Sequence, residues 1–125
     1  MVFANTMKQA LKQGKVVFGP MISEIRSPGL AVMFAKAGFD FFFLDLEHSC
    51  FDLQTVSDYV MASRAAGIPM IVRPPTRKQH EALSRPLDIG AAGLLVPQIQ
   101  SVEDVRKVVQ RHAGAVSGGR GTSGP

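Results

Sequence analysis

Three ionisable residues, Asp45, Glu47 and His48, lie within four positions directly after an almost entirely apolar run, residues 39–44. This pattern indicates a buried strand that delivers charged groups to one end of a sheet. An imidazole flanked by carboxylates is suited to act as a general base near neutral pH. Since adjacent residues on an extended strand point to opposite faces, Glu47 and His48 either have different roles or have already left the strand. For Asp45, capping of a neighbouring turn is an equal alternative.

Arg73 ends a second apolar run, immediately before Pro74. A guanidinium at such a position requires an anion. A substrate carboxylate bound by two parallel hydrogen bonds is a natural partner. Asp88 lies just before another apolar run and needs a turn to approach these groups, so a place at a helix end without a function is an equal alternative. His80 and His112 have polar neighbours, and we expect them on the surface.

Four apolar runs alternate with segments of helical character. The runs 16–23, 39–47, 68–75 and 92–99 are predicted strands. The second run is too continuously apolar for a half-exposed strand, so we expect it to be covered on both faces. The segments 27–38, 52–67, 77–90 and 101–113 are predicted helices.

Local residues predict where these helices begin and end. Ser27 and Pro28 predict the N-cap and the first residue of the helix within 27–38. Asp52 is the expected cap of the second helix, and Ser101 begins a Ser-x-x-Asp capping box for the last. Pro86 lacks an N–H group, so we expect it to break the helix within 77–90 and to leave residues 87–90 as a last turn or a separate short helix.

The strand–helix order repeats four times, which predicts an α/β fold with a parallel sheet. Four such units form either a small open sheet or the N-terminal half of a (β/α)8 TIM barrel, whose full length is typically about 250 residues. In both, functional groups gather at the carboxyl ends of the strands, where the polar groups fall here. We assign residues 1–113 to this half-barrel. Residues 114–125, rich in glycine and serine, are predicted to form a loop or a disordered tail.

The composition is that of an ordinary globular protein. Of the 125 residues, 46% are hydrophobic and 19% are charged. The formal net charge of +4 is scattered along the chain, so we expect no nucleic-acid partner. The single Cys50 fits a reducing compartment, and no apolar stretch is long enough to predict a membrane span. Residues 1–15 lack the pattern of a signal peptide, so we expect a cytoplasmic location.

Four blocks of the sequence resemble the HpcH/HpaI aldolases and occur in that family's order and spacing. They are AGFDFFFLDLEHS (37–49), IVRPP (71–75), LDIGAAGLLVPQIQSVEDVRKVV (87–109) and GGRG (118–121). The resemblance implies the N-terminal half of a TIM barrel. It also implies a class II, metal-dependent pyruvate aldolase, such as the 4-hydroxy-2-oxoheptanedioate and 2-dehydro-3-deoxy-acid aldolases. Such a carbon–carbon lyase cleaves 4-hydroxy-2-oxo acids to pyruvate and an aldehyde through a metal-stabilised enolate.

The same resemblance implies roles for individual residues. His48 matches the catalytic base and Asp88 its orienting carboxylate, while Arg73 matches the residue that binds the substrate's keto oxygen and stabilises the enolate. Asp45 and Glu47 match supporting acidic residues. The cofactor implied is a divalent metal (Mg²⁺, Mn²⁺ or Co²⁺). Its ligands in the family lie in the second half of the barrel, beyond Pro125, so the resemblance places no metal ligand in this chain.

A second class of function stays open, because Arg73 alone is sufficient to hold a carboxylate. The chain is then a non-catalytic module that binds a small carboxylate or serves in an assembly. In either case the expected partner is a small 2-oxo acid, with no membrane partner. Four parallel strands also leave two edges and an apolar face uncovered, so we expect a homo-oligomer.

Overall fold

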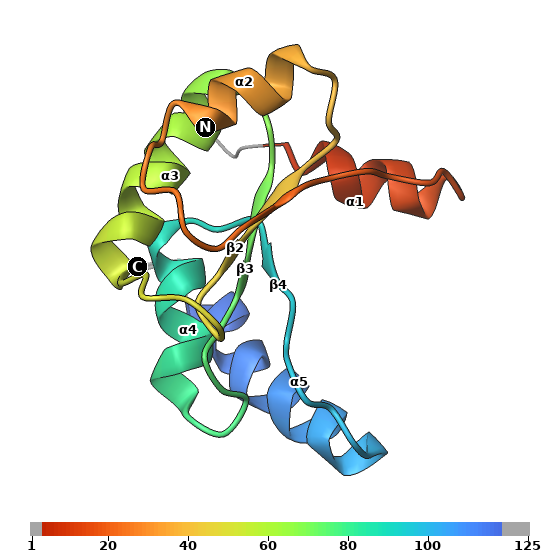
Figure 1. The fold of residues 1–125 in the computed structure, drawn as a ribbon. Helices are drawn as coiled ribbons and strands as arrows, with labels where there is room; N and C mark the ends of the chain where they lie inside the picture. Colours follow the sequence, from red (N-terminus) through yellow and green to blue (C-terminus); the bar gives the residue numbers. More distant parts are fainter. Residues whose placement is uncertain (1–3, 119–125) are drawn as a thin grey trace, which may run out of the picture.

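The computed structural model describes residues 4–118, in which four parallel strands form one sheet (Figure 1). The strands, in sheet order, are β1 (Met21–Ile22), β2 (Phe42–Asp45), β3 (Met70–Arg73) and β4 (Gly93–Leu94). The helices are α1 (Thr6–Lys12), α2 (Leu30–Lys36), α3 (Leu53–Ala66), α4 (His80–Ile89) and α5 (Val102–Gly118). Consecutive strands are neighbours and run parallel, which confirms the predicted α/β fold of four successive βα units.

The two faces of the sheet differ in burial. Residues paired in register lie on the same face, and Ile22, Leu44 and Val72 form a buried row. Figure 1 shows α2, α3 and α4 following one another along one side of the sheet, with α1 on the other. The alternate row contains Met21 and Phe43, and both side chains are partly exposed. The expectation that the strand within 39–47 is covered on both faces is therefore wrong for the described residues, since α1 has no buried residue and leaves Met21 and Phe43 partly exposed on its side of the sheet.

The core joins β2 to α3 and α2. Phe42 is fully buried, and its ring centroid lies 6.0 Å from that of Tyr59 on α3 and 5.7 Å from that of Phe34 on α2. The hydroxyl of Tyr59 donates to the carbonyl of Ile25 at 2.7 Å, so its polar end is satisfied. This packing fixes the strand that ends in Asp45 relative to the helix that follows it.

Helix starts agree with the sequence prediction at α3 but not at α2. Asp52 caps α3, accepting hydrogen bonds from the backbone N–H of Thr55 at 2.9 Å and from its hydroxyl at 2.8 Å. Helix α2, in contrast, begins at Leu30 with Gly29 as its N-cap, so the prediction of Ser27 as cap and Pro28 as first residue is wrong. The N–H of Leu30 donates to the carbonyl of Ser27. Ser27 thus contributes its backbone to a tight turn rather than its hydroxyl to a cap.

Helix α4 continues through Pro86, so the predicted break is wrong. A proline inside a helix removes one hydrogen bond and typically costs about 3 kcal/mol. Here the ring of Pro86 is fully buried, as is Leu83 on the same helix, and this packing opposes that cost. The helix ends instead at Gly90, whose φ of 119° is unfavourable for a residue with a β-carbon.

The chain ends differ from the sequence prediction. Helix α1 is not predicted by the pattern of residues 1–15, yet Asn5 caps it and donates from Nδ2 to the carbonyl of Ala92 at 3.0 Å. Helix α5 starts as predicted, with the hydroxyl of Ser101 accepting from the N–H of Asp104. It extends to Gly118, so residues 114–118 are helical rather than loop. The rest of the predicted tail, residues 119–125, lies outside the described residues. No helix within residues 4–118 has the length and apolarity needed to span a membrane.

Candidate functional site

Asp45 and Arg73 are the last residues of neighbouring strands and are paired in register. The Nε of Arg73 donates to Oδ1 of Asp45 at 2.8 Å, and its Nη2 donates to Oδ2 at 2.6 Å. Asp45 is 1% exposed and the side chain of Arg73 is 22% exposed. The anion that the sequence analysis required for Arg73 is therefore Asp45 of the same chain. The two side chains form the bidentate ion pair that guanidinium and carboxylate groups prefer.

The pair shifts the ionisation of both groups. The hydrogen bonds from Arg73 hold the pKa of Asp45 below its ordinary value, against the opposing effect of burial. The carboxylate in turn raises the pKa of Arg73. Oδ1 of Asp45 also accepts from the backbone N–H groups of Glu47 at 2.8 Å and His48 at 3.4 Å. Asp45 is thus ionised, and it bends the chain after β2 around its own carboxylate.

Glu47 lies at the centre of the polar groups. Its side chain is 8% exposed, and Oε1 accepts a hydrogen bond from Nε2 of Gln98 at 2.8 Å. Oε2 lies 3.5 Å from Nε of Arg73 and 3.6 Å from Nε2 of His48. The arrangement therefore links three strand ends through one carboxylate.

His48 projects from this cluster into solvent, with 69% of its side chain exposed. Its Nε2 faces Oε2 of Glu47 at 3.6 Å, while the exposed remainder of the ring is accessible to a ligand above the strand ends. A ring that is oriented by a carboxylate and is otherwise accessible has the geometry expected of a general base.

Asp88 lies elsewhere. It is an exposed residue in the last turn of α4, and the chain after it returns to the start of β3, where the N–H of Ala92 donates to the carbonyl of Met70. His48 follows the opposite, carboxyl end of β2. The structure therefore brings together Asp45, Glu47, His48 and Arg73 but does not bring Asp88 to His48 within one chain.

Residues that the sequence prediction did not assign to the site complete its surroundings. Gln98 follows β4, and its polarity at the end of an apolar run was the available signal. The guanidinium of Arg73 lies 5.8 Å from the ring centroid of Phe43, and its Nη2 lies 3.9 Å from the sulfur of Met21. Nothing in the sequence around Phe43 or Met21 indicated that these two side chains would lie beside Arg73.

A divalent metal does not fit the described residues by themselves. Both oxygens of Asp45 bind Arg73, and Oε1 of Glu47 binds Gln98, so neither carboxylate is free to act as a full ligand. Within residues 4–118 no three acidic, histidine or cysteine side chains come together as a metal site. A hard divalent cation in a protein is normally held by several oxygen ligands.

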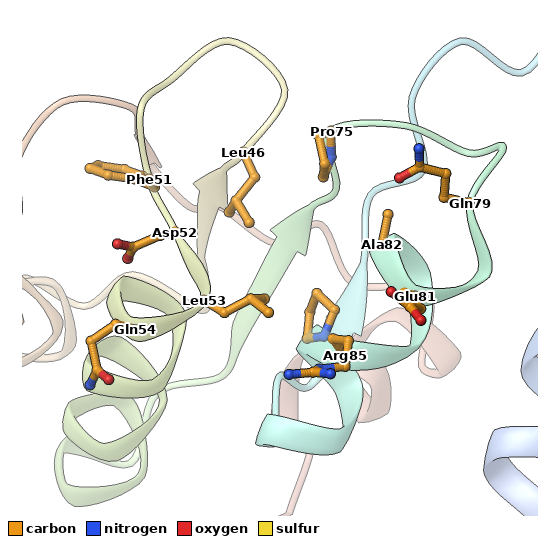
Figure 2. Close-up of a pocket in the computed structure, with 11 residues that line it drawn as sticks. Leu46, Phe51, Asp52, Leu53, Gln54, Pro75, Gln79, Glu81, Ala82 and Arg85 are labelled. Atoms are coloured by element: carbon orange, nitrogen blue, oxygen red, sulfur yellow. The ribbon is translucent and has the colours of Figure 1, made fainter.

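A groove of about 670 Å³ is lined by residues that follow β2 and β3 and by residues of α3 and α4. Figure 2 shows it between the start of α3 and α4, with Leu46 and Pro75 at the ends of the two strands and Arg85 on α4. None of the four clustered site residues lines it. The groove is therefore separate from the candidate site.

A parallel βα half-barrel with an arginine, a histidine and two carboxylates at its carboxyl edge is the arrangement of an α/β enzyme of the TIM-barrel class. The family model described as HpcH/HpaI aldolase/citrate lyase matches residues 21–125. The chain belongs to this family, as the sequence resemblance indicated.

Individual relatives agree with this assignment. A hydroxypyruvate/pyruvate aldolase of Paraburkholderia phytofirmans is 34% identical over 98% of this chain and 48% of its own length. A 5-keto-4-deoxy-D-glucarate aldolase of Salmonella paratyphi A is 32% identical over 98% of this chain and 47% of its own length. The crystal structure of an HpcH/HpaI aldolase from Desulfitobacterium hafniense superposes with a TM-score of 0.79 and 34% identity, over 85% of this chain and 40% of that one.

The chain thus spans less than half the length of these relatives. Its four βα units are half of the barrel of this family, which confirms the predicted fold class.

Proposed function

We propose that this chain supplies the base and the arginine of a pyruvate-type aldolase active site. The reaction is cleavage of a 4-hydroxy-2-oxo acid to pyruvate and an aldehyde. The observation that carries the proposal is the placement of Arg73 beside an accessible His48 at the carboxyl edge of the sheet. Nε and Nη2 of Arg73 are occupied by Asp45, while Nη1 forms no hydrogen bond among the described residues. Nη1 is therefore available to a substrate oxygen.

These groups suit the two charge changes of a retro-aldol cleavage. His48 takes the proton of the C4 hydroxyl, and the aldehyde forms as the C3–C4 bond breaks. The electron pair of that bond moves into C2–C3, so negative charge develops on the oxygen at C2. Nη1 of Arg73 donates to that oxygen and stabilises the enolate. The proton that His48 took is then returned to C3 of the enolate, which yields pyruvate and restores the neutral imidazole.

Asp45 and Glu47 have supporting roles in this proposal. Asp45 holds the guanidinium by two hydrogen bonds, so that its free edge does not rotate away from the substrate. Glu47 orients the ring of His48. The divalent metal implied by the family would take its ligands from residues outside 1–125, since the described residues do not provide a site for it.

Two features support the choice of substrate class. The relatives from Paraburkholderia and Salmonella, a hydroxypyruvate/pyruvate aldolase and a 5-keto-4-deoxy-D-glucarate aldolase, are both aldolases of oxo acids. An arginine with a free donor edge, beside a base, matches a substrate whose oxo group becomes an enolate.

The test is a coupled assay of pyruvate release from 4-hydroxy-2-oxo acids, with Mn²⁺ or Mg²⁺ and with or without a chelator. It is run on the chain alone and on the chain mixed with the remaining half of the Paraburkholderia relative. We expect His48→Ala to lower the rate by about 10²- to 10⁴-fold. The matched control is His80→Ala, since His80 is exposed at the start of α4. Arg73→Lys is compared with Arg106→Lys, whose arginine is exposed on α5.

Each outcome decides between the two classes of function. Metal-dependent release that His48→Ala abolishes supports the aldolase. Binding of pyruvate without turnover, lost in Arg73→Lys, supports the alternative of a carboxylate-binding module. If pyruvate neither binds nor is released in either preparation, the proposed role of Arg73 is wrong.

A further inference from the structure

Gln98 has an unusual backbone. Its φ is 56°, and it is the only non-glycine residue within residues 4–118 with a φ in the positive region. This conformation is unfavourable for a residue with a β-carbon. Such a residue adopts it where contacts with the surrounding structure hold it there. Pro97, directly before it, is buried, so the chain is held in place where it leaves the sheet.

The side-chain amide of Gln98 lies against Glu47. Nε2 donates to Oε1 of Glu47 at 2.8 Å and so joins the end of β4 to the end of β2, with β3 between them. Glu47 has several rotatable bonds, and its backbone fixes only the start of the side chain. Since the amide holds one oxygen, the other faces Nε2 of His48 at 3.6 Å and Nε of Arg73 at 3.5 Å.

We propose that Gln98 is a positioning residue, which holds the carboxylate of Glu47 between the base and the arginine. Its effect on catalysis rests on the proposed function, whereas its effect on Glu47 does not. Gln98 acts through Glu47 and, in the described part of the chain, forms no hydrogen bond with His48 or Arg73 themselves. A loss of this contact frees the carboxylate to rotate, so that the ring of His48 loses its orienting partner.

Three variants distinguish the effect of the side-chain amide of Gln98 from the effect of its backbone conformation. Gln98→Leu removes the amide but keeps the positive φ. Gln98→Gly removes the amide and also relieves the backbone conformation. Gln98→Glu keeps the shape but places a second carboxylate against Glu47. The matched control is Gln100→Leu, because Gln100 is also exposed and only its backbone N–H forms a hydrogen bond, with Asp104.

The kinetic test uses pyruvate release by the chain in the preparation that is active. We expect each Gln98 variant to lower kcat by about 10- to 100-fold, as misplacement of a catalytic group does, with little change in KM. The melting temperature of Gln98→Gly should equal or exceed that of the wild type. The double variant Glu47→Ala/Gln98→Leu should be no slower than Glu47→Ala alone. Additive losses, or a fall in melting temperature without a fall in kcat, would overturn the proposal.

Nuclear magnetic resonance tests the contact independently of activity. In the labelled wild-type chain we expect nuclear Overhauser effects between the side-chain amide protons of Gln98 and the methylene protons of Glu47. In Gln98→Leu, but not in Gln100→Leu, the χ angles of Glu47 should become averaged. If the chain releases no pyruvate but shows these effects, the proposed function fails and the positioning of Glu47 stands. If Glu47 keeps one rotamer in Gln98→Leu, the positioning role is wrong.

Discussion

Replacement of Asp45 by asparagine tests whether the pair with Arg73 holds the carboxyl edge of the sheet together. The carboxylate accepts four hydrogen bonds, two from Arg73 and one each from the backbone N–H groups of Glu47 and His48. Asparagine keeps the shape but offers one oxygen and an NH₂ group. That NH₂ must face a donor of Arg73, so at least one charged hydrogen bond is replaced by a contact between two donors.

The expected loss of stability is about 3 kcal/mol. Removal of one partner of a buried ion pair typically costs about 3–5 kcal/mol. The lower end applies here because Arg73 is 22% exposed and recovers part of its hydration in the variant. For a domain of this size the loss corresponds to a fall in melting temperature of roughly 10 °C. The matched control is Asp58→Asn, an exposed residue of α3, for which we expect a change within about 0.5 kcal/mol.

Urea unfolding of both variants, followed by circular dichroism from pH 7 to pH 2, gives the measurement. The pKa of Asp45 is lowered in the folded state, so its contribution is fully present above the unfolded value, near 3.8, and is lost as the pH falls through the lower folded value. The difference in stability between wild type and Asp45→Asn should therefore be constant above about pH 5 and should narrow steadily as the pH falls from there towards 2. A gap no larger than that of Asp58→Asn, or one that does not change with pH, would refute this account of the pair.

Two glycine substitutions test close contacts of the backbone. Gly19→Ala should destabilise the fold by about 1–3 kcal/mol in urea unfolding, because an added β-carbon would clash with the carbonyl oxygen of Phe41, which cannot rotate away. Its control is Gly29→Ala, where the nearest atom is 3.7 Å away, and a change beyond about 0.5 kcal/mol there would contradict the contact argument. Gly90→Ala should reduce the free energy of unfolding by about 1–2 kcal/mol, because the φ of 119° at this position is unfavourable for a residue with a β-carbon. The melting temperature should fall accordingly. An unchanged melting temperature would show that α4 can end without a glycine.

The fold, and the gathering of four of the candidate site residues at one edge of the sheet, could be predicted from the sequence because apolar runs and strand ends are local signals. Asp45 and Arg73 each follow an apolar run, and parallel strands bring such positions to one edge. The partner of Arg73 was less predictable. Two neighbouring strands must be placed in register before Asp45 is seen to face it, and register is set by the whole sheet rather than by either run.

The remaining differences have the same origin in tertiary structure. Pro86 is a helix breaker by local chemistry, yet its buried ring is retained within α4. Helix α1 has no buried residue, so it carries no periodic apolar pattern from which to predict it. Gln98 meets Glu47 only after the sheet has formed, and nothing in the sequence marks its positive φ.

The open face of the sheet leads to a last prediction, that the 125-residue chain self-associates in solution. Met21, Phe43 and Ile71 lie on this face, and Leu95, 43% exposed, follows the edge strand β4. An uncovered apolar face beside an unpaired strand edge favours association with a second copy.

A charge at Leu95 tests this surface. Leu95→Lys would place an ammonium group at the edge that a second copy must cover, and natural proteins use lysine at such edges to prevent pairing. We expect sedimentation velocity to show dimers or larger species for the wild type and a dissociation constant at least about tenfold higher for the variant, equivalent to about 1.4 kcal/mol. Met61→Lys is the control, because Met61 is 71% exposed on α3, on the helical side of the sheet. A folded wild-type monomer would contradict the prediction. If Met61→Lys raised the dissociation constant as much as Leu95→Lys, the interface would not lie on the open face, because the two positions lie on opposite sides of the sheet.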